Sequence, residues 1–230
     1  MGALSAAHDI LHSLVDFLFP PTCLLCGSTD TVNGFLCSGC IDTFTDVALD
    51  YNSPPRRIDH VDAVSILHPY DDGCRKLIHA LKYHGMPSVG LFLGGLIGRK
   101  TAADFSPPAL SLLVPVPLHP TRFRERGYNQ SERLATGFSA FSGLAVDETL
   151  LTRCRKTPTQ TALDEADRAA NVLGAFEFAG RTSLDGRHVI LIDDVLTTGS
   201  TVSDCARALR EGGARGVTVC VASTPDIKDA

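Results

Sequence analysis

Apolar residues follow two different spacings along the chain, and these spacings predict a series of strands and helices. Continuous or alternating apolar runs, typical of strands, occur at residues 61–67, 112–117, 174–178, 189–192 and 217–221. Apolar residues three or four positions apart, typical of amphipathic helices, occur at residues 5–19, 70–85, 86–100 and 200–211, and another helix begins near 129. This order predicts an α/β fold, with a mostly parallel sheet that the last strand closes and that helices flank.

Residues 188–203, HVILIDDVLTTGSTVS, carry the most specific pattern in the chain. The run of β-branched apolar residues is typical of a parallel strand covered on both faces. Asp193 and Asp194 follow at the expected end of this strand, which is where ligands bind in open α/β sheets. Small and hydroxyl-bearing residues at 197–201 then lead into the next helix.

These residue types together suit a ribose that carries a 5-phosphate. The free backbone N–H groups and the positive dipole at a helix start attract phosphate. Two adjacent carboxylates suit the sugar hydroxyls or a hydrated magnesium ion. The alternative is an ordinary turn with a capping Thr or Ser, but such a turn has no need for two acids and three threonines around one glycine.

Four cysteines form two C-x-x-C pairs, Cys23 with Cys26 and Cys37 with Cys40. This spacing is typical of structural zinc, which four thiolates hold in a tetrahedron. Two disulfides are the alternative, which the reducing compartment expected for this chain disfavours. A redox-active C-x-x-C is disfavoured because two such pairs occur in one short unit.

Cationic side chains that suit phosphate lie in two further segments. Lys82 precedes a glycine turn at the end of an expected helix, where it can reach a pyrophosphate or simply complement the helix dipole. Arg122, Arg124 and Arg126, the arginine segment, form the densest positive stretch. The arginine fork suits phosphate oxygens. A solvated basic loop is the alternative for this segment.

The composition is that of a globular protein. The chain has 230 residues, 44% of them hydrophobic, and its net charge of −5 argues against a surface that binds nucleic acid as a whole. No apolar stretch is long enough for a membrane span and no signal peptide is evident, so we expect a cytoplasmic protein. We expect residues 1–50 to form a helix and zinc module, residues 51–230 the main domain, and residues 41–60 a linker.

Several motifs occur in the order found in the competence protein ComF family, which the chain resembles. They are FPPTCLLC, a second C-x-x-C, LKYHG, VPVPLHPTRFRERGYNQ, a Thr-Gln pair, R-x-x-N and LIDDVLTTGST. The last motif resembles the loop that binds phosphoribosyl pyrophosphate (PRPP) in type I phosphoribosyltransferases. The resemblance covers almost the whole chain. It implies a type I phosphoribosyltransferase-like fold, similar to amidophosphoribosyltransferases, with a small N-terminal zinc-binding module and a link to DNA uptake.

The resemblance also implies roles for individual residues. It implies zinc on the four cysteines, and PRPP with magnesium at the loop. The implied PRPP-binding residues are Asp193, Asp194, Val195, Leu196, Thr197, Thr198, Gly199, Ser200 and Thr201. Those implied for pyrophosphate or phosphate groups are Lys82, Arg122, Arg124 and Arg126. The two aspartates would hold magnesium directly or through water. Thr159, Gln160, Arg168 and Asn171 match the segment before the PRPP strand.

Three functions are compatible with these motifs. The first is phosphoribosyl transfer, in which magnesium and nearby cations stabilise the departing pyrophosphate. The second is a protein that holds single-stranded DNA and acts with the DNA-uptake machinery. The third is a sensor of PRPP without chemistry. The sequence leaves the acceptor and the assembly into a homo-oligomer open.

Overall fold

The computed structural model describes residues 21–52, 56–105, 108, 110–154, 174–181 and 183–225. The helix expected at residues 5–19 lies outside these described residues, as does the segment that contains Thr159, Gln160, Arg168 and Asn171. The chain divides into two compact units, Met1–Asp46 and Val47–Ala230.

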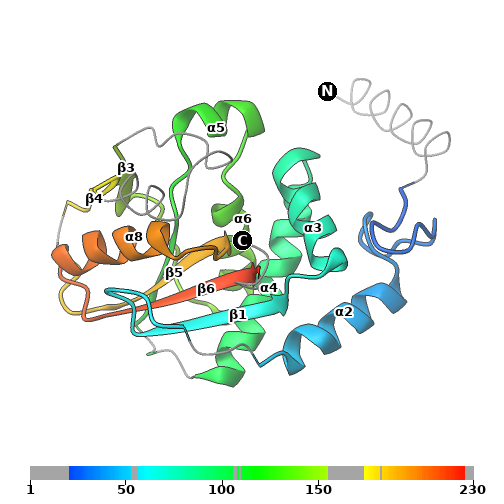
Figure 1. Ribbon diagram of the computed structural model, residues 1–230, viewed down its shortest axis with the longest axis horizontal. Helices are drawn as coiled ribbons and strands as arrows, with labels where there is room; N and C mark the ends of the chain where they lie inside the picture. Colours follow the sequence, from blue (N-terminus) through cyan, green and yellow to red (C-terminus); the bar gives the residue numbers. More distant parts are fainter. Residues whose placement is uncertain are drawn as a thin grey trace, which may run out of the picture. The chain divides into compact units, whose positions relative to one another are not determined.

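A parallel four-stranded sheet forms the centre of the larger unit (Figure 1). In spatial order its strands are β1 (Ala63–Pro69), β6 (Gly216–Thr224), β5 (His188–Val195) and β2 (Leu112–Pro115). Two short strands, β3 (Leu151–Arg153) and β4 (Phe176–Phe178), form a separate antiparallel pair. The expected α/β fold with a mostly parallel sheet is therefore confirmed, although the sequence pattern did not predict β3.

The expectation that the last strand closes the sheet is wrong. β6 lies between β1 and β5, and all nine of its residues are buried. Its sequence, GVTVCVAST, combines apolar and small hydroxyl residues, which suits a strand covered on both faces. The position was not predictable from sequence order, because parallel strands are joined by crossovers and need not be neighbours.

Helices pack against the sheet and against one another. α8 (Ser200–Glu211) packs on β5 and β6 and also contacts the β3–β4 pair (Figure 1). α4 (Pro87–Asp104) packs against β1 and β6, and α6 (Gln130–Ser142) packs against β5 and β2. The remaining helices of this unit that the structure describes are α3 (Asp72–Tyr83), which contacts α4, and α5 (Pro120–Arg126), which precedes α6.

The close approach of α4 and α6 depends on glycine. A Cβ atom built on Gly94 would lie 2.0 Å from the carbonyl oxygen of Leu134, and one built on Gly137 would lie 2.1 Å from that of Leu91. Neither position has room for a side chain, so the two backbones pack directly against each other. Gly94, in the helix that the sequence predicts at residues 86–100, and Gly137 of α6 therefore permit this close packing.

The linker expected at residues 41–60 is wrong in its first half. α2 (Ser38–Asp50) continues through residues 41–50. Phe44 and Ala48, four positions apart, are both buried, so this stretch has a helical apolar face. In the sequence, Pro54 and Pro55 come after Asp50, the last residue of α2, so they are no obstacle to a helix over residues 38–50.

Candidate functional site

The two aspartates lie at the carboxyl end of β5, where only Val195 follows them in the strand. Successive side chains of a strand point to opposite faces, so the two carboxylates have different surroundings. The Oδ1 atom of Asp193 accepts a hydrogen bond from the hydroxyl of Ser131 at 3.0 Å and another from the backbone N–H of Asp194 at 2.9 Å. Ser131 lies in the first turn of α6, so α6 and β5 meet at this point.

Asp194 is buried and forms an ion pair with Lys82. The Nζ atom of Lys82 lies 2.9 Å from Oδ2 of Asp194, and the side chains are 22% and 6% exposed. Burial is the largest single effect and lowers the pKa of Lys82, but Asp194, with further contributions from Asp193 and Tyr83, more than offsets it, so the net pKa is raised and the amine stays charged. The end of α3 thus brings a cation to the strand end.

Asp193 has the opposite electrostatic balance. Burial is the largest cause and the Asp194 charge the second, and together they raise its pKa to about 7, although Lys82 and the hydrogen bond from Ser131 act in the other direction. A carboxyl group with such a pKa gains most from a ligand that brings hydroxyl donors or positive charge.

The segment after β5 turns at Gly199 and opens α8. Gly199 has φ +88°, in the left-handed region that favours glycine, and as the N-cap residue it has no side chain to cap the helix; the Ser200 N–H has a long hydrogen bond of 3.4 Å to the Thr198 hydroxyl. The hydroxyls of Thr198 and Ser200 lie 2.9 Å apart, and Thr197 and Thr198 are exposed. The Leu196 side chain is buried in the core, its N–H donates to the Ser223 backbone oxygen at 2.9 Å, and its carbonyl oxygen accepts from the Thr224 hydroxyl at 2.7 Å, so this residue supports the turn from below and offers no free group to a ligand. Hydroxyls and uncapped N–H groups therefore gather at this phosphate-sized turn.

A residue that the sequence did not single out holds this turn. The Nη1 atom of Arg56 donates a hydrogen bond to the backbone oxygen of Thr197 at 2.9 Å. Two residues later, Ile58 covers the turn, since a Cβ built on Gly199 would lie 3.2 Å from the Ile58 side chain. Arg56 lies 141 residues from Thr197, so no local pattern indicated the contact.

The arginine segment is helical, and its three arginines do not gather at one point. α5 begins after His119, whose Nδ1 accepts from the Thr121 N–H at 3.2 Å, and it ends at Gly127 with φ +82°. Arg126 donates to Gln130 and lies over the Tyr83 ring, with its guanidinium carbon 5.7 Å from the ring centroid.

Two further contacts define the arginine segment's surroundings. The hydroxyl of Tyr128 donates to the backbone oxygen of Leu81, which fixes the segment to the end of α3 beside Lys82. Arg124 instead lines a pocket, and Arg122 is close enough to Arg153 for the two charges to repel, which contributes to a lowered Arg153 pKa after the larger effect of burial. Of the three, Arg126 is therefore the one whose contacts place it next to the Lys82 helix.

The smaller unit brings the four cysteines of the two C-x-x-C pairs together. The sulfur atoms of Cys23, Cys26, Cys37 and Cys40 all lie within 4.8 Å of one another, and those of Cys26 and Cys37 are 3.6 Å apart. Zinc–sulfur bonds of about 2.3 Å imply sulfur–sulfur distances of about 3.8 Å in a tetrahedron. Four cysteines at these distances fit structural zinc with no position open for substrate.

Comparisons with known proteins match both units. Residues 14–49 match the double zinc ribbon domain family, and residues 129–226 match the phosphoribosyl transferase domain family. Among curated relatives, the DNA utilization protein YhgH of Salmonella typhimurium is 34% identical over 152 residues, which cover 64% of this chain and 66% of that protein.

Two further relatives have competence in their names. Competence protein F of Haemophilus influenzae is 35% identical over 108 residues, 46% of this chain and 47% of the relative. Competence protein ComFC of Streptococcus pneumoniae is 31% identical over 133 residues, 55% of this chain and 56% of the relative. The chain is a homologue of the ComF competence proteins. The resemblance seen in its motifs is thereby confirmed, as is the phosphoribosyltransferase-like fold with a zinc-binding module. The matches span just under two thirds of YhgH and about half of the two competence proteins.

Among the residues that the structure describes, no helix combines the length and the apolar character needed to cross a membrane.

Proposed function

We propose that this ComF homologue binds PRPP with magnesium at the carboxyl end of β5. The observation that carries the proposal is the convergence, at one strand end, of two aspartates, the ion-paired Lys82 and the uncapped turn at residues 197–201. The turn would hold the 5-phosphate through backbone N–H groups and hydroxyls. The aspartates would hold the ribose hydroxyls. This assignment places all parts of one ligand on adjacent elements.

The residues present also fit a magnesium ion held through water. Magnesium keeps several waters and takes only one or two carboxylates from a protein. Lys82 already pairs with Oδ2 of Asp194, and Oδ1 of Asp193 already accepts two hydrogen bonds. These contacts favour the indirect arrangement over direct ligation. When bound, the ion supplies positive charge to the pyrophosphate group of PRPP.

Phosphoribosyl transfer is the chemistry that this site would support. The bond between ribose C1 and a pyrophosphate oxygen breaks, the pyrophosphate leaves with the electron pair, and a lone pair of the acceptor forms the new bond to C1. Lys82 has three N–H donors, of which one faces Asp194, so it can also neutralise the leaving group. Arg126, at the same end of α3, is the second candidate for this role.

Titration calorimetry with PRPP and magnesium tests the proposal. We expect micromolar binding by the wild-type chain, and we expect Asp193→Asn to lower the affinity at least about tenfold, since hydrogen bonds to a charged carboxylate are lost. Asp185→Asn is the matched control, because it removes an exposed carboxylate from the turn before β5. A wild-type chain that does not bind PRPP rules the proposal out.

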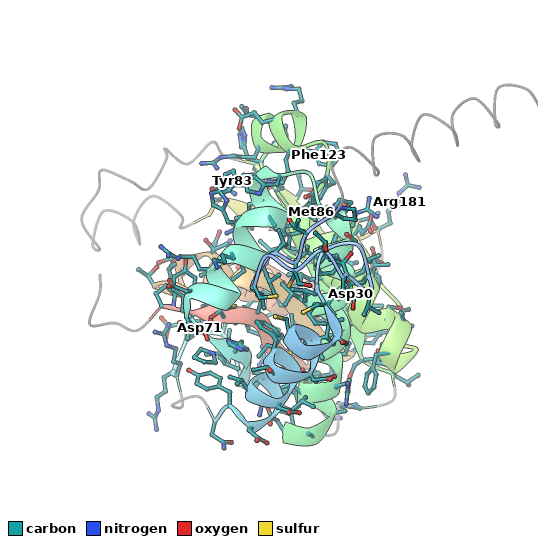
Figure 2. All side chains as sticks on the ribbon, turned by 90° about the vertical axis from the view of Figure 1, so that its right-hand side faces the viewer. Asp30, Asp71, Tyr83, Met86, Phe123 and Arg181 are labelled. Carbon is teal, nitrogen blue, oxygen red and sulfur yellow. The ribbon has the colours of Figure 1, made fainter. Side chains whose placement is uncertain are left out.

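The names of the relatives, which refer to competence and DNA utilization, support a link to DNA uptake. One surface of this chain favours a role in holding a DNA strand as the second candidate function. The Tyr83 side chain is 60% exposed with Arg126 over its ring, and Phe123 is 45% exposed. Both lie at the same end of the larger unit (Figure 2). Exposed aromatic rings next to arginines bind single-stranded DNA by stacking its bases and neutralising its phosphates.

A further inference from the structure

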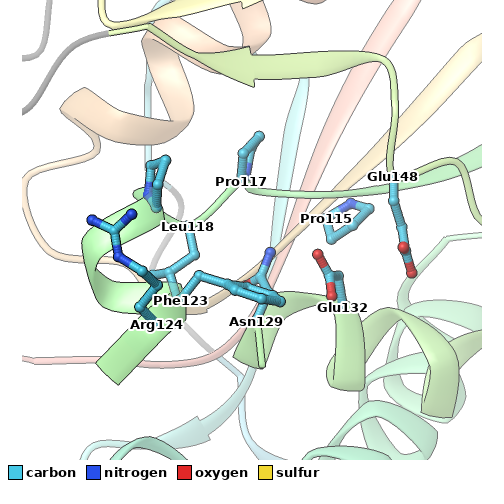
Figure 3. Close-up of a pocket in the computed structure, with 9 residues that line it drawn as sticks. Pro115, Pro117, Leu118, Phe123, Arg124, Asn129, Glu132 and Glu148 are labelled. Carbon is cyan, nitrogen blue, oxygen red and sulfur yellow. The ribbon is translucent and has the colours of Figure 1, made fainter. Parts of the chain in front are cut away.

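A pocket of about 340 Å³ lies between α5, the end of β2 and the start of α6 (Figure 3). Of the residues assigned above to PRPP, only Arg124 lines it. Ligand pockets of small molecules begin at about 300 Å³, so the volume suits a single ring system.

The pocket opens at the ligand-binding edge of the sheet. Pro115 ends β2 and pairs in register with Ile192 of β5, the residue before Asp193. At the start of α6, Ser131 bonds to Asp193 while the next residue, Glu132, lines the pocket. The pocket and the aspartate site are therefore neighbours along the carboxyl ends of two adjacent strands, where α/β proteins bind their ligands.

One part of the lining is flat and apolar. The pyrrolidine rings of Pro115 and Pro117 and the half-exposed ring of Phe123 contribute to it. Proline and phenylalanine rings are rigid, and an aromatic ring is most favourable next to another ring in an offset-stacked or edge-on arrangement. This part of the pocket suits a planar ring better than a flexible chain.

Two carboxylates also line the pocket, on the side where Pro115 lies. Figure 3 shows Glu132 and Glu148 on one side of the pocket and Phe123 and Arg124 on the other. Burial is the first cause of a raised Glu132 pKa, and the charge of Glu148 is the second; Asn129 and Arg133 act in the other direction but do not cancel the rise. Ionised carboxylates only accept hydrogen bonds, so a ligand here must donate them.

We propose that this pocket binds a nucleobase that carries an exocyclic amino group. The amino group donates to Glu132, and the ring lies against Phe123 and the prolines. Carboxylates accept from the amino group of cytosine, whereas uracil and thymine present a carbonyl oxygen at the same position, which Glu132 repels. The proposal concerns base binding alone and does not depend on PRPP binding.

The base can come from a free nucleoside or from a DNA strand, and paired probes separate these sources. The full chain is titrated with cytidine against uridine, and with a short dC oligomer against a dT oligomer of equal length. We expect about tenfold tighter binding of the cytosine form in at least one pair. A preference in both pairs indicates a site open to free nucleosides, and a preference with oligomers alone indicates a base held within a strand.

Two variants test whether the pocket is responsible. Glu132→Gln keeps the side-chain size but replaces one of the two acceptor oxygens by an NH2 donor, which can bond the carbonyl oxygen of uracil as well as the remaining oxygen bonds the amino group of cytosine, so we expect the cytosine preference to disappear. Glu125→Gln, an exposed position on α5 outside the pocket lining, should keep it. Equal binding of both bases by the wild-type chain, or a preference that survives in a folded Glu132→Gln chain, overturns the proposal. PRPP titration of the same variant should be unchanged, which separates this result from a failure of the PRPP site.

Discussion

Asp193 and Asp194 are consecutive residues with opposite energetic roles. Asp194 is compensated by Lys82 at 2.9 Å, so removal of its charge would leave a buried lysine without its partner. Asp193 has a pKa raised to about 7 by burial and by Asp194, so its ionised form destabilises the fold. The charge of Asp194 therefore stabilises the fold through Lys82. The charge of Asp193 costs stability in the free protein, and a ligand that brings hydroxyl donors or positive charge would compensate it.

This difference predicts how Asp193→Asn changes stability with pH. The folded-state pKa lies above the ordinary value of 3.8, so stability is highest below that value and declines as the pH rises towards about 7. The asparagine oxygen can still accept from Ser131 and from the Asp194 N–H, while the penalty of ionisation disappears. We expect urea denaturation to show the variant more stable than wild type at pH 8, and the difference to shrink at pH 5. A variant less stable than wild type at pH 8 would contradict the assignment.

Arg56 allows a second prediction at a single residue. Its guanidinium holds the Thr197 carbonyl, and it also adds positive charge beside the turn proposed for the 5-phosphate. We expect Arg56→Ala to weaken binding of PRPP and of ribose 5-phosphate several-fold, and to leave binding of free pyrophosphate unchanged, in calorimetric titrations. Arg57→Ala is the control, because the neighbouring arginine is exposed. Equal losses for all three ligands would show a general effect on the fold.

At the scale of elements, the sequence predicted the strands, turns and helices that follow one another directly along the chain. The apolar run of β5, its acidic end, the glycine turn and α8 follow one another directly, so their order is visible in the sequence. Ser131 and Asp193 are 62 residues apart, and the Lys82–Asp194 pair joins α3 to β5, so these partners depend on how the elements pack. The position of β6 between β1 and β5 also depends on how the elements pack, so the sequence did not predict it.

The four-cysteine cluster is expected to hold the smaller unit together through zinc. A unit of this size has a small core, in which Phe35, Leu36 and Phe44 are buried, so much of its folding free energy must come from the metal. We expect Cys37→Ser with Cys40→Ser to abolish the zinc content measured by atomic emission and to lower stability towards urea. Cys154→Ser, an exposed cysteine outside the cluster, should change neither. A metal-free wild-type chain of equal stability would contradict a structural role for zinc.

At the scale of the whole molecule, charge limits how this protein can hold DNA. The chain has 21 lysines and arginines against 26 aspartates and glutamates, which gives a net charge of −5. Its overall field therefore repels a nucleic acid, and a strand can be held only where basic residues are concentrated. The arginine segment is the candidate, with Arg122 and Arg124 on α5 next to the exposed Phe123 ring.

If DNA is held only at this local site, its affinity should fall moderately with salt concentration, and the slope should depend on the arginines of the site. Each phosphate of a single strand that a protein neutralises contributes about 0.7 to the slope of log affinity against log salt concentration. Replacing Arg122 and Arg124 by Ala should therefore lower the slope for a dT oligomer by about 1.4, measured by fluorescence anisotropy over a salt series. Replacing the exposed Arg181 and Arg215, which changes the net charge equally, should leave the slope as it is, because net charge alone is screened at these salt concentrations. Equal slopes for both double variants would show that the arginine segment does not contact the strand. If the wild-type chain does not bind DNA at all, the strand-holding function is ruled out.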